Sequence, residues 1–170
     1  RMRPDFRQRI GKELFMRIGV NTGPAVVGNM GSHSRFDYTM LGDAVNLAAR
    51  LEGINKQFNT YTMISRDTLH QAGGAFPARE LSRVAVVGRK QPVTVYEPLF
   101  REEYAAKERL LAVFADGLQA YYAGRFQQAA RLFERIAGSD PPASCYLKRC
   151  RELIDHPPAT WDGVWVMTSK

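Results

Sequence analysis

Cysteine, long apolar runs and blocks of like charge are all scarce in this sequence, and each scarcity narrows what the protein can be. Only two cysteines occur, Cys145 and Cys150. Five residues apart in a helical pattern, they fall on different faces, so neither a disulfide nor a metal site is indicated, and a reducing, intracellular setting is favoured. No apolar run approaches the roughly 18 residues that a membrane span needs, and no signal peptide opens the chain.

The charge is positive but dispersed. The 24 Lys and Arg against 17 Asp and Glu give a net charge of +7, spread along the chain. Such a balance suits nucleic acid, a membrane surface or an anionic small molecule. Because no nucleic-acid-binding motif accompanies the charge, we expect no nucleic-acid partner. With 45% apolar residues among 170, the chain can bury one ordinary core with a small appendage.

Short alternating segments separated by turns dominate the first hundred residues. In the segment 35–41, Phe36 and Tyr38 face one way while Asp37 and Thr39 face the other. Glycine and proline place turns at 21–24, 28–32 and 88–92. The predicted strands are 15–20, 25–27, 35–41, 60–64, 78–87 and 93–96.

Helical patterns interrupt these strands. One apolar stripe consists of Ala44, Leu47, Ala48, Leu51 and Ile54. Asp43 is the expected N-cap of this helix, and Ser65 is expected to cap a short helix that runs through Gln71. The irregular alternation of strands and helices predicts an α+β sandwich, with one sheet and helices on one side.

From about Glu102 the pattern is helical throughout. Two apolar stripes consist of Phe114, Gly117, Leu118 and Tyr121, then Phe126, Ala129, Ala130, Phe133 and Ile136. Their small and aromatic residues resemble a tetratricopeptide unit, although Ala120 stands where that unit has a large residue. One repeat cannot bury its own face, so we expect it to pack on the preceding domain or on a helix at 144–154. We therefore predict domains at 1–100 and 101–170, the second a tetratricopeptide-like helical hairpin.

Candidate chemistry lies on the first long helix and on the strand before it. Asn46 and Arg50 are four residues apart, so an amide and a guanidinium emerge together on the side away from the apolar stripe. Thr39 adds a hydroxyl that both donates and accepts. The amide of Asn46 suits a sugar, the guanidinium of Arg50 suits a phosphate, and the hydroxyl of Thr39 suits the edge of a base. The simpler alternative is a solvated helix face beside an ordinary strand threonine.

Several ordered motifs resemble the class III adenylate/guanylate cyclase catalytic domain. They are Met16-Arg17-Ile18-Gly19-Val20-Asn21-Thr22-Gly23, Val27-Gly28-Asn29-Met30-Gly31, Asp37-Tyr38-Thr39 followed by Asn46-Leu47-Ala48-Ala49-Arg50-Leu51-Glu52, and Val93-Thr94-Val95-Tyr96-Glu97. Matches in this order over about 85 residues are more specific than any single glycine pattern. The resemblance implies a ferredoxin-like cyclase sandwich, truncated at its N-terminus, with a C-terminal helical hairpin.

The resemblance also implies roles for particular residues. Thr39 corresponds to the base-recognition position, where threonine favours ATP over GTP. Asn46 corresponds to the residue that orients the ribose, and Arg50 to the one that stabilises the transition state. The family's triphosphate-binding lysine is replaced by Val87, so Arg89 or Lys90 is the expected substitute. A basic turn that is merely solvated is the alternative.

The same resemblance implies what this chain lacks. Two Mg²⁺ or Mn²⁺ ions are expected in the complete enzyme, held by two aspartates on strands that precede Arg1, and no residue here is assigned as a metal ligand. The site is expected between the subunits of a homodimer. The basic opening, which has no initiator Met, and the ending at 161–168, which resembles that of membrane-tethered bacterial cyclases, predict a cytoplasmic module cut from a longer protein. The fragment alone is expected to be inactive.

Three hypotheses follow from the sequence. The first is an ATP cyclase that makes cyclic AMP and pyrophosphate. The second is a cyclase-like regulatory or nucleotide-binding module without catalysis, favoured by Val87 and by the missing aspartate pair. The third is a protein-docking function of the helical tail, with the α+β part as a scaffold.

Overall fold

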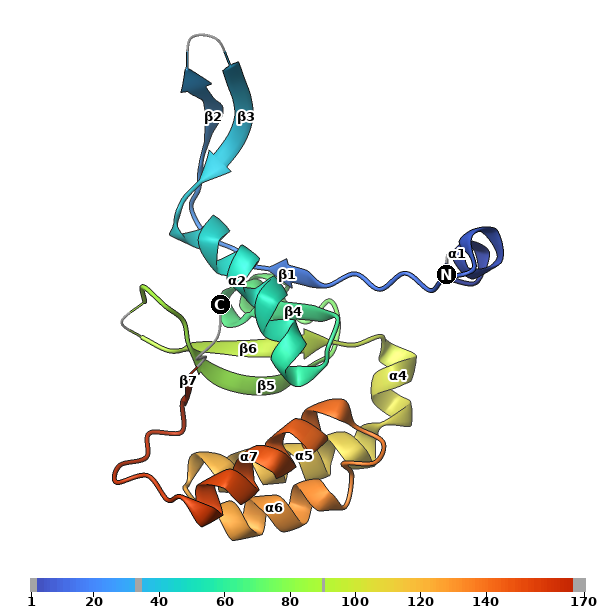
Figure 1. The fold of residues 1–170 in the computed structure, drawn as a ribbon, viewed down its shortest axis with the longest axis vertical. Helices are drawn as coiled ribbons and strands as arrows, with labels where there is room; N and C mark the ends of the chain where they lie inside the picture. Colours follow the sequence, from blue (N-terminus) through green and yellow to red (C-terminus); the bar gives the residue numbers. More distant parts are fainter. Residues whose placement is uncertain (1–2, 33–34, 90, 167–170) are drawn as a thin grey trace.

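A five-stranded mixed sheet forms the centre of the molecule, and the computed structural model describes residues 3–32, 35–89 and 91–166 (Figure 1). The strand order is β1-β4-β6-β5-β7. The bounds are β1 Ile18–Val20, β4 Thr62–Ser65, β5 Ala78–Ala85, β6 Val93–Pro98 and β7 Trp165–Val166. The inner pairs are antiparallel, whereas β1 and β7 at the two edges pair in parallel with β4 and β5. The predicted α+β class is confirmed.

Strands β2 (Val26–Ser32) and β3 (Arg35–Leu41) form a separate antiparallel hairpin that projects away from the sheet (Figure 1). The turn predicted at 28–32 is wrong, because these residues continue β2 opposite β3, with Gly28 beside Thr39. Glycine lowers the strand propensity of the 28–32 segment. Hydrogen bonds to β3 nevertheless make it a strand, and local propensity does not reveal such a partner. The hairpin exposes large apolar side chains, namely Val26, Val27, Tyr38, Met40 and Leu41.

Helix α2 (Asp43–Phe58) packs against the sheet through one apolar stripe. Its buried apolar residues are Leu47, Leu51, Ile54 and Phe58. The expectation that Asp43 caps this helix is wrong. Gly42 occupies the cap position at φ 150°, without a side-chain cap bond, and a Cβ there would lie 3.2 Å from the carbonyl oxygen of Pro24. The helix ends at Asn59, which adopts the left-handed conformation with φ 53°.

The approach of α2 to β1 depends on one glycine. A Cβ at Gly19 would lie 2.1 Å from the Ala48 carbonyl oxygen and 2.4 Å from the Glu52 nitrogen, so only a glycine fits beneath the helix. The buried Asn55 fastens the same contact, since its Nδ2 donates to the Ile18 carbonyl at 3.0 Å. The alternation in β1 therefore presents Gly19 to the helix and leaves Ile18 exposed.

Replacing Gly19 by alanine is expected to cost about 2 kcal/mol of unfolding free energy, because the atoms in the way belong to the backbone of α2 and cannot rotate aside. Gly53→Ala is the matched control. Gly53 lies inside α2 with open space around its would-be Cβ, so alanine there is expected to be neutral or stabilising by up to about 1 kcal/mol. Urea unfolding of both variants checks this, and equal stabilities would contradict it.

The shorter helices fill the remaining connections. They are α1 Arg3–Ile10, α3 Arg66–Gln71 and α4 Arg101–Ala106. The expected cap at Ser65 is confirmed, since its hydroxyl accepts from the Thr68 nitrogen at 3.2 Å. The α1 helix was not predicted, because its residues lack an apolar stripe. No helix in the described ranges has both the length and the apolar character needed to cross a bilayer.

The C-terminal helices pack side by side beneath the sheet (Figure 1). They are α5 Glu108–Tyr122, α6 Phe126–Glu134 and α7 Pro141–Asp155. Gly117 admits the ring of Phe133, which would lie 2.9 Å from a Cβ at that position. Asp140 caps α7 by accepting from the Ala143 nitrogen at 3.1 Å. Buried residues of the sheet, α2 and these helices form one continuous cluster, so the hairpin of α5 and α6 packs on both the sheet and α7, the two expected alternatives. The tetratricopeptide likeness and the domain boundary near residue 100 stay predictions.

Candidate functional site

Helix α2 presents Asn46 and Arg50 away from its buried stripe. Asn46 is exposed and Arg50 is half-buried, one turn further along the same side. The prediction that both side chains lie outside the core is confirmed. The amide of Asn46 lies in the first turns of the helix, where backbone N–H groups also favour an anionic ligand.

The turn that follows β5 meets Arg50. Its backbone is closed by a hydrogen bond from the Arg89 nitrogen to the Val86 carbonyl at 3.0 Å, and Gly88 has a φ of 81°, which favours glycine. The Arg50 guanidinium donates to the Val87 carbonyl. This bond joins residues 37 positions apart in sequence and holds Arg50, the residue expected to stabilise the transition state, against the basic turn.

Asp43 joins the same group of charges. The Arg89 guanidinium donates to its carboxylate, through Nε at 2.9 Å and through Nη2. This hydrogen bond lowers the pKa of Asp43 from its usual value, helped by the charges of Arg89 and Arg50. Two guanidinium groups therefore lie close to one carboxylate at the start of α2. A phosphate could replace this carboxylate as the partner of Arg89, because each group presents two negatively charged oxygens to the fork of N–H donors on a guanidinium.

The structure does not bring every predicted site residue together. Thr39 lies on β3 of the projecting hairpin, opposite Gly28, and no hydrogen bond in the described part of the chain links it to Asn46 or Arg50. Arg89 lies beside Asp43, whereas Lys90 falls outside the described residues. The assignment of Thr39, Asn46, Arg50, Arg89 and Lys90 to one substrate site stays a prediction.

Three residues make long-range hydrogen bonds around the start of α2 and the end of β1 that sequence reasoning does not identify. Asp43 was interpreted as a cap rather than as the partner of Arg89. Asn21 donates from Nδ2 to the Ala44 carbonyl at 3.0 Å, tying the end of β1 to the first turn of α2. Thr22 bonds the Thr68 hydroxyl at 3.1 Å. Only the Asn21-Thr22-Gly23 motif hinted at such a role, because contacts between distant residues leave no local periodicity.

The residues present do not make a metal centre by themselves. No group of three or more His, Cys, Asp or Glu side chains gathers within the ranges 3–32, 35–89 and 91–166. Asp43, the carboxylate nearest the two arginines, is already paired with Arg89. The donors in the described part of the chain therefore do not fit a pair of divalent cations.

Comparison with known proteins adds the family. The model described as "Adenylate and Guanylate cyclase catalytic domain" matches residues 2–97. The terminal-differentiation specific adenylate cyclase of Dictyostelium discoideum is 30% identical over 146 residues, which are 81% of this chain and 7% of that protein. Adenylate cyclase 1 of Rhizobium meliloti is 39% identical over 85 residues, 50% of this chain and 13% of the relative.

A solved adenylyl cyclase structure also resembles this chain in fold. The crystal structure of the adenylyl cyclase CyaB from P. aeruginosa matches with a TM-score of 0.51 and 32% identity, covering 60% of this chain and 52% of that one. This likeness supports a cyclase-type α+β fold for the part that it covers. The chain spans 7% and 13% of the length of the two curated relatives named above.

Proposed function

Because the chain belongs to the family of adenylate and guanylate cyclase catalytic domains, we propose that it forms part of an enzyme that converts ATP into 3′,5′-cyclic AMP and pyrophosphate. The observation that carries the proposal is the meeting of Arg50 and Arg89 at the turn after β5, with Asp43 as their counter-ion. ATP is proposed as the substrate in preference to GTP because two relatives are named adenylate cyclases.

The proposed chemistry relies on positioning and charge. The ribose 3′-hydroxyl loses its proton to solvent as its oxygen attacks the α-phosphate, the new P–O bond closes the ring, and pyrophosphate leaves with the electrons of the broken P–O bond. Arg50 would neutralise the charge that develops on the phosphate, Asn46 would orient the ribose, and Thr39 would bind the base. Arg89, with Lys90, would bind the triphosphate after exchanging Asp43 for a phosphate oxygen.

Divalent cations and a second subunit complete the proposal. Two Mg²⁺ or Mn²⁺ ions, with ligands outside this chain, would supply charge neutralisation at the phosphates. A homodimer is supported by the β2–β3 hairpin, whose apolar side chains are between 55% and 76% exposed and suit burial against another copy. The site would then lie between the two subunits. We propose that the module is located in the cytoplasm, where ATP is available.

The direct test uses the protein expressed from its complete gene. It is expected to release cyclic AMP from Mg-ATP or Mn-ATP, with little cyclic GMP from GTP, as measured by chromatography of the products. This chain alone is expected to be inactive, which makes it the matched control. A complete protein that binds ATP but yields no cyclic nucleotide with either metal would reject the proposed activity.

A second candidate is a cyclase-like module that binds nucleotide without catalysis. Two observations favour it: Val87 stands where the resemblance expects a lysine, and Arg89 is already occupied by Asp43. Nucleotide binding without turnover, together with upstream sequence that lacks two aspartates at the family positions, would support this module. The presence of both aspartates would count against it.

The helical tail is also proposed to bind a protein partner. An open hollow of about 620 Å³ beside α6 is bordered by Arg125, Arg131 and Arg135 around Leu132. No ion pair in the described part of the chain involves these three arginines. Their charge suits an acidic segment. Charge reversal at Arg131 and Arg135 should abolish capture of such a partner and leave nucleotide binding intact.

A further inference from the structure

The last described strand connects the helical tail to the proposed site. Strand β7 pairs in parallel with the end of β5, Trp165 beside Val84 and Val166 beside Ala85. The next residue after this pairing is Val86, which opens the turn that contains Arg89. The pairing therefore restrains β5 at the point where it enters the turn, and this edge of the sheet is supplied by residues about 80 positions later.

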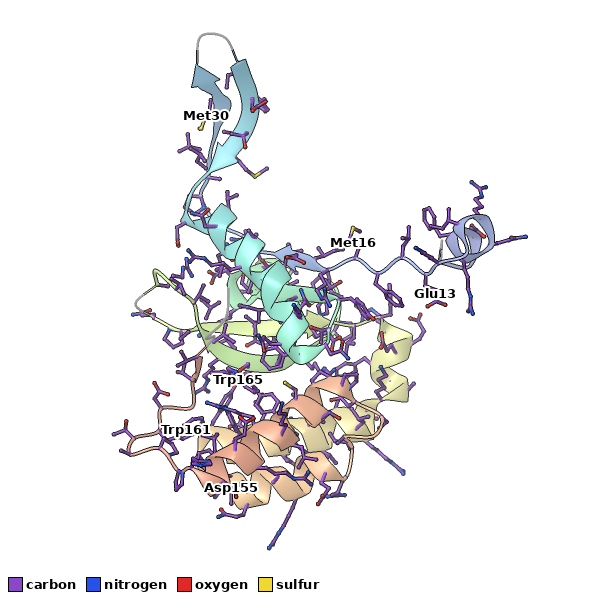
Figure 2. The ribbon with its side chains drawn as sticks, in the orientation of Figure 1. Glu13, Met16, Met30, Asp155, Trp161 and Trp165 are labelled. Atoms are coloured by element: carbon purple, nitrogen blue, oxygen red, sulfur yellow. The ribbon has the colours of Figure 1, made fainter. Side chains whose placement is uncertain are left out.

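The ring of Trp165 also contacts helix α2, at the end of the helix that lies beyond Arg50. Its centroid lies 5.2 Å from that of Phe58, in the last turn of α2, and 5.0 Å from that of Tyr146 in α7. A third contact, at 6.1 Å, is with Tyr121 in α5. Figure 2 shows Trp165 between the sheet and the tail helices. One residue thus contacts the helix that bears Arg50, the strand that leads into the turn, and two helices of the tail.

These contacts matter because the site is assembled from two separate pieces. Arg50 comes from α2, while Val87 and Arg89 come from the turn, and hydrogen bonds from the side chains of Arg50 and Arg89 link the two pieces. The shared core already packs α2 and β5 together, and Trp165 adds a restraint to both, at the end of the strand that leads into the turn. A shift of about 1 Å in a catalytic group costs on the order of a hundredfold in rate.

From these contacts we infer that Trp165 is a positioning residue, through which the tail holds α2 and the turn after β5 in the arrangement that turnover requires. The inference rests on the proposed cyclase function. It goes beyond that function by making the tail part of the catalytic geometry rather than only a docking surface. Arg149, whose guanidinium carbon lies 5.8 Å from the Trp165 ring centroid, helps to hold the ring in place.

The test compares variants of the complete protein. Trp165→Ala is expected to lower kcat about tenfold or more with KM changed by less than about threefold, because Arg50 is expected to act in the transition state. The Arg89 amide, which donates to the Val86 carbonyl, is expected to exchange with deuterium faster. Trp165→Leu retains apolar volume and is expected to fold if the alanine variant does not, with the same split between kcat and KM.

Trp161 provides the matched control. It belongs to the same aromatic cluster, 5.0 Å from Tyr121 and 5.0 Å from Phe126, but its ring contacts involve only α5 and α6 in the described residues. Trp161→Ala is expected to lower stability while leaving kcat and exchange at Arg89 close to those of the unchanged protein. Unchanged kcat in Trp165→Leu, or equal loss of kcat in Trp161→Ala, would overturn the inference. If the unchanged protein makes no cyclic nucleotide, the proposed function fails, while exchange at Arg89 still decides the coupling.

Discussion

Arg50→Ala in the complete protein is expected to lower kcat by about a hundredfold to a thousandfold, with a much smaller change in KM. The physical reason is that a donor aimed at developing charge contributes to the transition state more than to the bound substrate. The half-buried position of Arg50, against the Val87 carbonyl, orients the guanidinium before substrate binds. Steady-state kinetics of cyclic AMP formation measures both parameters.

Two control variants separate charge from geometry. Arg50→Lys keeps the positive charge but loses the planar fork of donors, so it is expected to recover only part of the lost rate. Arg131→Ala removes an exposed arginine from α6, a helix that carries no residue of the proposed substrate site, and is expected to leave kcat unchanged. Full turnover by the Arg50→Ala enzyme would end the assignment of a catalytic role to this residue.

Arg79→Met is expected to lower the free energy of unfolding by about 3 to 5 kcal/mol. Arg79 is largely buried, with 10% of its side chain exposed, and bridges Glu97 in β6 and Asp140 at the start of α7. Its Nε donates to Glu97 at 2.7 Å, and its Nη1 donates to Asp140 at 2.8 Å. Removing the cation leaves two buried carboxylates facing each other, which costs more than the lost attraction alone.

The same variant is expected to show a pH dependence with a defined sign. Burial already raises the pKa of Glu97, although Arg79 opposes this, and loss of Arg79 raises the pKa of Glu97 further. A folded-state pKa above the unfolded one means that the folded protein binds more protons, so stability rises as the pH falls through that range. The deficit of Arg79→Met should therefore be smaller at about pH 5 than at about pH 7.

Arg151→Met serves as the comparison for this prediction. Arg151 pairs with Glu134 at 2.9 Å, but both side chains are more than half exposed, so its loss is expected to cost less than about 1 kcal/mol at either pH. Urea unfolding followed by tryptophan fluorescence measures both variants. Equal losses in the two variants would show that burial of the Arg79 network does not contribute to stability.

Local patterns predicted most of the elements but not the glycine-containing part of the hairpin. The stripe from Leu47 to Ile54 predicted α2, and Ser65 predicted the start of α3, because both signals lie within a few residues of the structure that they specify. The 28–32 segment looked like a turn because its partner, β3, contributes the hydrogen bonds that make it a strand. Propensity cannot report a partner that lies elsewhere in the chain.

The candidate site divides in the same way. The spacing of Asn46 and Arg50 was enough to place both on the outer side of one helix. That Arg89 pairs with Asp43, 46 residues earlier, could not be predicted, since an aspartate at a helix start has a simpler local explanation as a cap. The structure corrected that explanation by showing Gly42 at the cap position.

The sequence by itself determined the fold class, the helix that carries Asn46 and Arg50, and the motifs that the family comparison matches, because periodicity and motif order are properties of neighbouring residues. Only the tertiary structure decided which elements meet. It brought the turn after β5 to Arg50, placed α2 over Gly19, and joined β7 to β5 across about 80 residues. Such contacts arise when separate elements bury their apolar surfaces together, and no local pattern encodes that choice.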